Sequence, residues 1–353
     1  MLKQSLKRWL LGTVFCSFTR NSVIMKKYIL TCTLLLCSLV KAQTAGCTDP
    51  LAKNYNPEAD VNDGSCVYKK VSLSPVKSVR LPQNIDESSG LLFWNDTLYT
   101  HNDSNDTRLY AIDTLSGAVQ QVINLQGLPN KDWEAIAQDE EYIYIGDFGN
   151  NARGNRTDLK IIRVNKESLL SSIPETDIIS FSYSDQSDLS PKKGNATDFD
   201  CEALIVVKDS LYLFTKQWKS RKTTVYALPK LPGSHIAEAR QTYNVKGLIT
   251  DAVYIEDKKL VVLLGYSIRL QPFFYLLYDF NDTDFFGGNK RKIKIAKPFH
   301  QMEGITTTNG IHFYATNEYF NGIPLINVVQ KLHFFNLEPF ISDYFKGLPV
   351  INK

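Results

Sequence analysis

The chain has 353 residues, and its 40 Lys and Arg against 37 Asp and Glu give a formal net charge of +3. The first 42 residues carry seven of these basic residues and no acid, so without them the charge is 33 − 37 = −4. A mildly acidic chain gives no global electrostatic reason to expect a nucleic-acid partner, and we expect none.

The segment "MKKYILTCTLLLCSLVKAQ", which starts at Met25, has the layout of a secretory signal peptide. A basic start precedes an apolar run, and the small residue Ala42 marks a cleavage position. We therefore expect a signal peptide over residues 1–42, with Met25 as a candidate true start. The apolar run is too short to span a bilayer comfortably, and no later run is long enough. These features predict an exported, periplasmic or extracellular protein without a transmembrane segment, and we expect a monomer.

A turn-rich module is predicted over residues 43–68, where Cys47 and Cys66 bound "CTDPLAKNYNPEADVNDGSC". Such a composition cannot build a core of its own, and in an exported protein the two cysteines are predicted to form a disulfide. Cys201 is then left as a buried thiol. The module resembles a Cys-bounded unit at the ends of secreted bacterial proteins, some of which are suspected of calcium binding or adhesion. Its "DVNDGS" segment offers oxygen ligands but lacks a full EF-hand loop.

Residues 71–353 read as strand after strand. Short runs rich in Tyr, Phe, Val and Ile alternate with Asn, Asp and Gly turns, and no amphipathic helical stretch longer than Lys166 to Ser172 is expected. The chain is therefore predicted to be all-β. Two basic clusters, "KQWKSRK" from Lys216 and "KRKIKIAK" from Lys290, are interpreted as solvated faces of edge strands.

A ten-residue spacing that recurs along the chain indicates which all-β architecture to expect. Five times, a hydroxyl or acidic residue stands ten positions before the aromatic or apolar residue of the next strand: Ser89, Glu134, Glu202, Thr250 and Glu303. The intervals of 45, 68, 48 and 53 residues suit four-stranded blades. The sequence thus predicts a five-bladed β-propeller, with six blades as an alternative. Ser74 to Pro82 should supply the outer strand of the last blade after Gln330 to Leu337, closing the ring.

The five aligned residues should face the central channel at one depth, forming a ring of oxygens. Three carboxylates there repel one another by roughly 4 kcal/mol per pair at ~4 Å and an effective dielectric near 20. Protons, a basic side chain such as Lys216 or a cation could neutralise them. The all-oxygen set favours calcium, with Ser89, Glu134, Glu202, Thr250 and Glu303 as predicted metal ligands. The alternatives are a metal-free ring hydrogen-bonded to neighbouring backbone and a magnesium or transition-metal site.

The segments "ESSGLLFWNDTLYTHND", "EAIAQDEEYIYIG", "CEAL", "TDAVYI" and "MEGI" resemble the blade openings of calcium-activated nucleotidases of the apyrase type. That resemblance implies a five-bladed propeller with calcium in its channel. Over more of its length the chain resembles exported bacterial propellers of unassigned activity, with the pattern E-x-S-G, T-H-N-D, D-W-E and G-D-x-G-x-N. The nucleotidases continue their first blade with paired aspartates, of which only Asp103 is present here.

Two functions from different classes follow. The first is a non-catalytic module that binds a glycan, peptide or small molecule at the mouth of the channel, through exposed loop residues that should matter little to folding: Asn102, Asp103, Asp147, Asn150, Asn151, Lys216 and Trp218. The second is a metal-dependent hydrolase of phosphate esters or anhydrides, nucleotidase-like or phytase-like, in which Asp103, Asp147 or His101 activates water. The missing aspartate favours the binding module.

Overall fold

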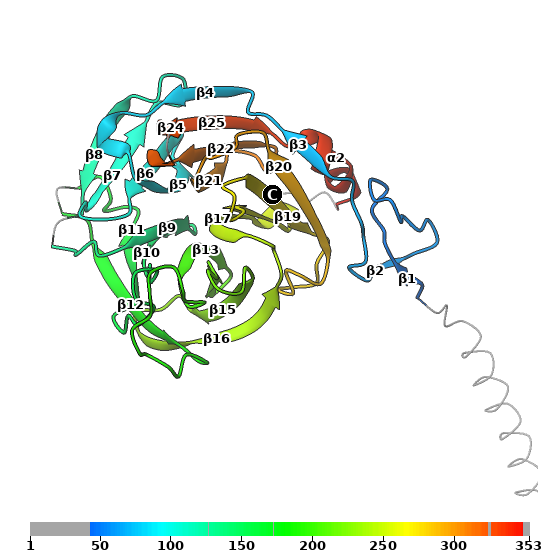
Figure 1. Ribbon diagram of the computed structural model, residues 1–353, viewed down its shortest axis with the longest axis horizontal. Helices are drawn as coiled ribbons and strands as arrows, with labels where there is room; N and C mark the ends of the chain where they lie inside the picture. Colours follow the sequence, from blue (N-terminus) through cyan, green and yellow to red (C-terminus); the bar gives the residue numbers. More distant parts are fainter. Residues whose placement is uncertain (1–42, 126, 172, 324–325, 349–353) are drawn as a thin grey trace, which may run out of the picture.

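The computed structural model describes residues 43–125, 127–171, 173–323 and 326–348, and they fold into a five-bladed β-propeller with a small module at its rim (Figure 1). The all-β prediction is confirmed, and so is the disulfide-bounded module. The predicted signal peptide, residues 1–42, lies outside the described residues. Within them, no helix has the length and apolarity needed to cross a membrane.

Each blade is built on four antiparallel strands, and in the first four blades these strands run from the channel outward in chain order. The first blade contains β5 (Ser88–Trp94), β6 (Thr97–Asn102), β7 (Arg108–Ile112) and β8 (Val119–Asn124). The second contains β9 (Trp133–Gln138), β10 (Tyr142–Asp147), β11 (Lys160–Asn165) and β12 (Thr176–Tyr183). The third contains β13 (Cys201–Val207), β14 (Ser210–Thr215), β15 (Thr223–Pro229) and β16 (Gly233–Tyr243).

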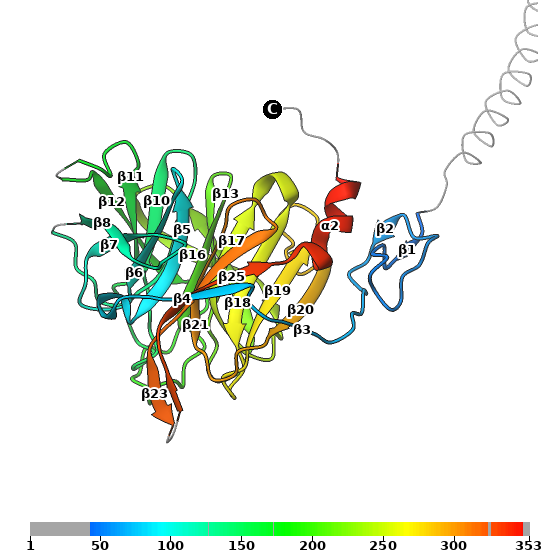
Figure 2. The same ribbon diagram turned by 90° about the horizontal axis from the view of Figure 1, so that it is seen from above.

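The fourth blade contains β17 (Leu248–Ile255), β18 (Leu260–Tyr266), β19 (Pro272–Tyr278) and β20 (Asn289–Ile295), and β3 (Val71–Leu73) adds a parallel fifth strand outside β20. The fifth contains β21 (Met302–Thr307), β22 (His312–Asn317), β25 (Lys331–Asn336) and β4 (Lys77–Arg80). A hairpin of β23 (Phe320–Ile323) and β24 (Ile326–Val328) follows β22. It projects from the face of the propeller on which β22 ends (Figure 2).

The ring is closed by a strand from the other end of the chain, as predicted. Strand β4 pairs antiparallel with β25, and Val79 lies opposite Leu332. This pairing joins the segment that precedes the first blade to the last blade. It also removes the exposed strand edge that an open ring would leave. A parallel pairing of the outer strands β12 and β16 also joins the second and third blades into one eight-stranded sheet.

The apolar cores lie between neighbouring blades. Strands such as β18 and β19, "LVVLLGY" and "PFFYLLY", are buried on both faces and therefore read as continuous apolar runs. One core joins Tyr144 of the second blade to Leu204 and Leu213 of the third. The five inner strands contact one another all round the channel. The propeller is thus a rigid frame that fixes the positions of five inner-strand ends.

The module before the propeller is held by the Cys47–Cys66 disulfide and by a parallel pair, β1 (Ala45–Gly46) and β2 (Val61–Asn62). It contacts the fourth blade through Asp279, which accepts hydrogen bonds from Thr48 and Asn62. Both views place it at the rim beside the fourth blade (Figures 1 and 2).

The helical expectation was wrong. Residues 166–172 form turns where they are described, whereas α2 (Glu338–Gly347) is a ten-residue helix. Pro339 stands in its first turn, where a missing N–H costs nothing. Ile341 is buried among side chains of the fourth and fifth blades, so the helix covers the core between them. Two short 3₁₀ helices, Gln83–Ile85 and Glu256–Lys258, complete the described secondary structure.

Candidate functional site

The ten-residue spacing has a structural cause. In every inner strand the pairing with the second strand shifts by one residue, and the aligned residue lies in that β-bulge: Ser89, Glu134, Glu202, Thr250 and Glu303. A bulge adds one residue opposite its partner and turns a side chain out of the regular alternation. All five residues are buried. The repeat in the sequence is therefore a repeated backbone distortion at the same end of each inner strand.

Small residues follow the bulge because the centre is crowded. A Cβ on Gly90 would lie 2.9 Å from Nε2 of His101, and one on Gly304 would lie 2.6 Å from Oγ1 of Thr316. Asp251 is the exception in this position. It is buried, and its carboxylate accepts hydrogen bonds from its neighbour Ala252 and from Ile305 on the adjacent inner strand.

A cavity of about 180 Å³ opens at this end of the channel. In every blade the end of the second strand or the loop that follows it contributes to this cavity, through Asp103, Asn151, Lys216 and Trp218, Tyr266, and Glu318, and the other lining residues are Glu134, Asn195, Glu202, Gln301 and Glu303. The three ring glutamates thus share one cavity. The two ring hydroxyls are not among the lining residues. Ser89 donates to Glu134 at 3.1 Å, and Thr250 donates to the carbonyl oxygen of Met302 at 2.6 Å.

The ammonium group of Lys216 lies among these carboxylates. It contacts Oε2 of Glu202 and is 3.8 Å from Oε1 of Glu303. The rings of Trp218 and Tyr266 lie 5.0 and 5.2 Å from it, within the range of cation–π attraction. Burial alone would lower the pKa of Lys216, but the carboxylates raise it well above its usual value, so the lysine stays charged. Its expected exposed position was wrong, since it is only 4% exposed.

Asp200 holds this lysine and its loop in place. Its carbonyl oxygen accepts the backbone N–H of Lys216, and its carboxylate accepts the indole N–H of Trp218 at 2.7 Å and the backbone N–H of Asn150 at 2.6 Å. One buried acid therefore joins the loops of the second and third blades. Asp200 lies two positions before the aligned glutamate, where the first and second units also carry an acid, Glu87 and Asp132, but this position was not singled out from the sequence.

Negative charge is in surplus around the cavity. Its lining holds five carboxylates, those of Asp103, Glu134, Glu202, Glu303 and Glu318, and one ammonium group. Burial and then the neighbouring acids raise the pKa of Glu134 well above its usual value, and burial also raises that of Glu303. Oε2 of Glu303 and Oδ1 of Asp103 are buried without any hydrogen-bond partner. Glu318 was not singled out from the sequence.

A glycine allows the loop after β10 to cross these acids. A Cβ on Gly149 would lie 2.3 Å from Oδ2 of Asp132 and 2.5 Å from Oε1 of Glu134, so no larger residue fits. Burial and the charge of Asp200 raise the pKa of Asp132 to about 6. The acidic region thus extends from the cavity lining to the carboxylates packed under this loop.

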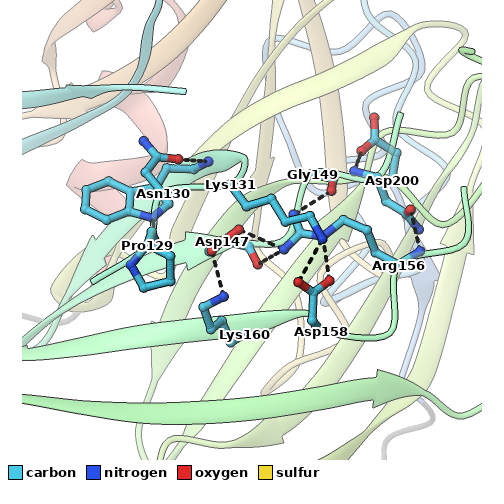
Figure 3. A network of polar contacts seen from close by, with 11 residues as sticks. Pro129, Asn130, Lys131, Asp147, Gly149, Arg156, Asp158, Lys160 and Asp200 are labelled. Carbon is cyan, nitrogen blue, oxygen red and sulfur yellow. Dashed lines mark hydrogen bonds and ion pairs between the residues drawn. The ribbon is translucent and has the colours of Figure 1, made fainter. Parts of the chain in front are cut away.

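Asp147 points into a different environment. It is fully buried, and its carboxylate pairs with Arg156 at 2.8 Å and with Lys160 at 2.9 Å, while Arg156 also reaches Asp158 at 3.1 Å (Figure 3). Lys160 lies directly opposite Asp147 in the β10–β11 pairing. The expected exposed position of Asp147 was therefore wrong, and this residue is not among those that line the central cavity.

Of the remaining candidate residues, some have structural contacts only and the others line the cavity. His101 is fully buried against Trp133, and burial lowers its pKa to about 4. Asn102 donates to Asp106, and the side chain of Asn150 donates to the carbonyl oxygen of Phe199. These three side chains hold loops together. Asp103, Asn151, Lys216 and Trp218 are the predicted mouth residues that line the cavity.

No protein-family model matches the chain, and no curated protein matches it. Solved structures similar to it include the WD40 repeats of RRP9, at 9% identity over 76% of this chain and 100% of that one, with a TM-score of 0.38. A putative 6-phosphogluconolactonase from Bacteroides uniformis shares 14% identity over 72% of each chain, with a TM-score of 0.35. A putative glucose dehydrogenase from Thermus thermophilus shares 8% over 73% and 99%, with a TM-score of 0.40. At these scores the similarities carry no argument about function.

Proposed function

We propose that this protein is an exported ligand-binding propeller whose central cavity takes a calcium ion beside Lys216. The observation that carries the proposal is the surplus of five carboxylates over one ammonium group in the cavity lining, a formal charge of 1 − 5 = −4 when all are ionised. Buried like charges of this number need protons or a cation to offset their repulsion.

The residues fit a hard cation. The lining offers carboxylate, amide and phenol oxygens and neither sulfur nor imidazole, which suits calcium better than a transition metal. Glu303 and Asp103 have buried oxygens without partners, and Glu318 stands in the same lining. These three side chains would hold the ion, while Glu202 stays paired with Lys216.

This ligand set differs from the one expected from the repeat. Ser89 and Thr250 are engaged elsewhere, so two of the five aligned positions would support the site rather than ligate. Within the described ranges, no three acidic, His or Cys side chains already surround one point closely enough to hold a metal. Calcium would therefore draw the carboxylates together. Bound there, it would supply a fixed positive charge at the mouth, to which a carboxylate, phosphate or hydroxyl group of the ligand could bind.

One observation favours the alternative function, a metal-dependent hydrolase. Asp103 lines the cavity, burial raises its pKa, and the hydrogen bond to Asp103 followed by burial raises the pKa of Glu87 to about 7. Such a carboxylate pair could accept a proton from water near neutral pH. Of the three catalytic candidates, however, His101 and Asp147 do not line the cavity. Phosphate release from nucleotides, inositol phosphates and aryl esters, with and without calcium, tests this alternative.

Direct calorimetric titration tests the calcium site. The parent, stripped with chelator, should bind one calcium per chain and bind magnesium much more weakly. Glu303→Gln should lower the calcium affinity at least tenfold, because it removes a charged ligand but keeps the shape. Glu238→Gln, an exposed residue on β16, is the matched control and should bind like the parent. No calcium binding by the parent at millimolar concentration would refute the site.

A further inference from the structure

A second cavity, of about 570 Å³, lies at the rim beside the fourth blade, between the linker after the disulfide and strands β19 and β20. Every charged residue that lines it is a lysine: Lys69, Lys70, Lys290, Lys292 and Lys294. No carboxylate is among its lining residues. Tyr68, Val71, Ser72, Ser267, Gln271, Pro272 and Phe273 complete it. We call this cavity the lysine groove.

Strand register explains why the lysines share one face. Along β20, Lys290, Lys292 and Lys294 alternate with Arg291, Ile293 and Ile295, whose side chains are buried on the other face. Residues two apart in a strand lie about 6.7 Å from one another, so the row is about 13 Å long. On β3, Ser72 pairs with Lys294, which places the lysine-bearing linker alongside this row.

These lysines lack counter-charges. Among the described residues, none of the five lies within 4.0 Å of a carboxylate oxygen, whereas lysines such as Lys131 and Lys230 do. Asp63 and Asp284 act on Lys290 electrostatically, but neither lines the groove. The positive charge in the groove is therefore open to a ligand.

Two of the charges are fixed by the fold. The ammonium of Lys290 donates to the carbonyl oxygens of Gly64, Phe286 and Gly288, at 3.0, 2.9 and 2.7 Å. That of Lys292 donates to the carbonyl oxygen of Val245 and lies 3.5 Å from the ring centroid of Phe273. Carbonyl oxygens satisfy these donors without neutralising their charge, although burial lowers the pKa of both lysines, that of Lys292 to about 8, so the wall is most positive below that pH. The groove is thus a preorganised positive wall, in contrast to the solvated strand face that the sequence predicts.

From these contacts we infer that the lysine groove binds an acidic oligosaccharide, a short chain carrying carboxylate or sulfate groups. A row of charges along one strand suits an extended chain with repeated anionic groups, and Ser72 and Ser267 add hydroxyl groups beside it. The cavity is of the size that holds a small ligand. The module and the propeller build the site together, since the linker forms one wall.

Nucleic acid fits the groove less well. Single strands bind proteins through bases stacked on open aromatic rings, but Phe273 is 2% exposed and Tyr68 donates its hydroxyl to Asp49. A sugar chain needs no such platform when charge and hydroxyl contacts hold it. The inference is independent of the calcium proposal, because the groove and the central cavity share no lining residue.

Binding of two probes of similar length tests it: a hexamer of galacturonic acid and a sulfated hexasaccharide. At least one should bind the full-length exported protein, with affinity that falls as salt rises. The variant with Lys70→Gln and Lys294→Gln, both exposed, should lose at least tenfold in affinity and keep its fold. The matched control carries Lys53→Gln and Lys193→Gln, which are also exposed and without ion pairs among the described residues, and should change less than twofold.

Any one of four results would overturn the inference. Neither hexamer binds at low salt; the control pair loses as much affinity as the groove pair, which would mean diffuse attraction; or a single-stranded oligonucleotide of the same charge binds more tightly than both sugars. A neutral hexasaccharide that binds as tightly as the acidic ones would equally contradict a site based on charge.

Discussion

The central cavity and the lysine groove each gather charge of one sign, but they are built differently. The cavity takes its carboxylates from the inner strands and mouth loops of several blades, and the ring glutamates among them are buried. The groove takes its lysines from one strand and a linker, and three of them are exposed. Neighbouring lysines ~7 Å apart in water repel by only about 0.6 kcal/mol. Burial, more than the number of charges, therefore distinguishes the central cavity from the groove, and it is the reason why we propose a cation there.

Removing the cavity's lysine should have the largest effect. Lys216→Met leaves Glu202 and Glu303 buried without an ammonium partner, and breaking a buried pair costs about 3–5 kcal/mol of unfolding free energy. Denaturant unfolding in chelator measures this loss. Calcium should recover part of it, because a bound cation replaces the missing charge. A change below about 1 kcal/mol would show that Lys216 is not what balances these acids.

The balanced network around Asp147 serves as the contrast. Asp147→Ala leaves Lys160 without an ion-pair partner among the described residues and leaves Arg156 with only Asp158, and we expect a loss of about 3 kcal/mol, at the low end for a buried pair because both cations keep some exposure. The loss should be the same with calcium and with chelator. Asp158→Ala, at a half-exposed partner of Arg156, is the control and should cost less than about 1 kcal/mol. A calcium-dependent loss in Asp147→Ala would tie this network to the cavity.

The stability of the protein should depend on pH through Glu87, which is hydrogen-bonded to the cavity residue Asp103. The pKa of Glu87 is raised from its usual 4.5 to about 7, so between these values the folded state binds more protons than the unfolded state and stability falls as pH rises, with the last part of the fall between about pH 7 and 8. His101 and His333, whose pKa values burial lowers to about 4 and about 3, are neutral in both states above pH 7, so their effect is confined to lower pH. Because Glu87 is exposed and its charge is screened by solvent, melting temperatures in chelator should fall by no more than about a degree between pH 7 and 8. With calcium the slope should flatten, and a rising slope in chelator would contradict the assignment.

The groove should give the smallest effect on stability. Lys70→Gln with Lys294→Gln should change the free energy of unfolding by less than about 0.5 kcal/mol, because both side chains are exposed. Any change should be stabilising at low salt and vanish at high salt, as expected for relieved surface repulsion. A loss above about 1 kcal/mol at any salt concentration would mean that these lysines support the fold.

The fold was predictable because its repeat is a backbone feature. The ten-residue spacing equals the distance from a bulge through the tight turn to the second strand, and it survives differences in blade length and side chain. The closing strand was likewise found from its position before the first blade. The helix α2 was missed because it is short and lies after the last unit of the repeat.

The site was only partly predictable, because burial of a loop residue depends on tertiary contacts. Lys216 read as part of an exposed basic cluster, and only the position of Asp200 and the two aromatic rings turns its side chain inward. The sequence did contain a signal for the ion pair of Asp147. Lys160 follows it by thirteen residues across a hairpin, and the two opposite charges lie face to face once the strand register is known. The sequence contained no signal for the lysine groove, because β3 pairs in parallel with β20 and is not part of the repeat.

The order of two melting temperatures tests whether calcium binds in the central cavity. Bound calcium should stabilise the parent by about 2.7 kcal/mol at a hundred times the dissociation constant. Glu303→Gln removes part of the charge surplus, so in chelator it should melt at or above the parent, and in calcium the parent should melt higher. Calcium binding at Glu303 predicts this reversal. A parent whose melting is the same in calcium and in chelator, together with no metal in the purified protein, would contradict it.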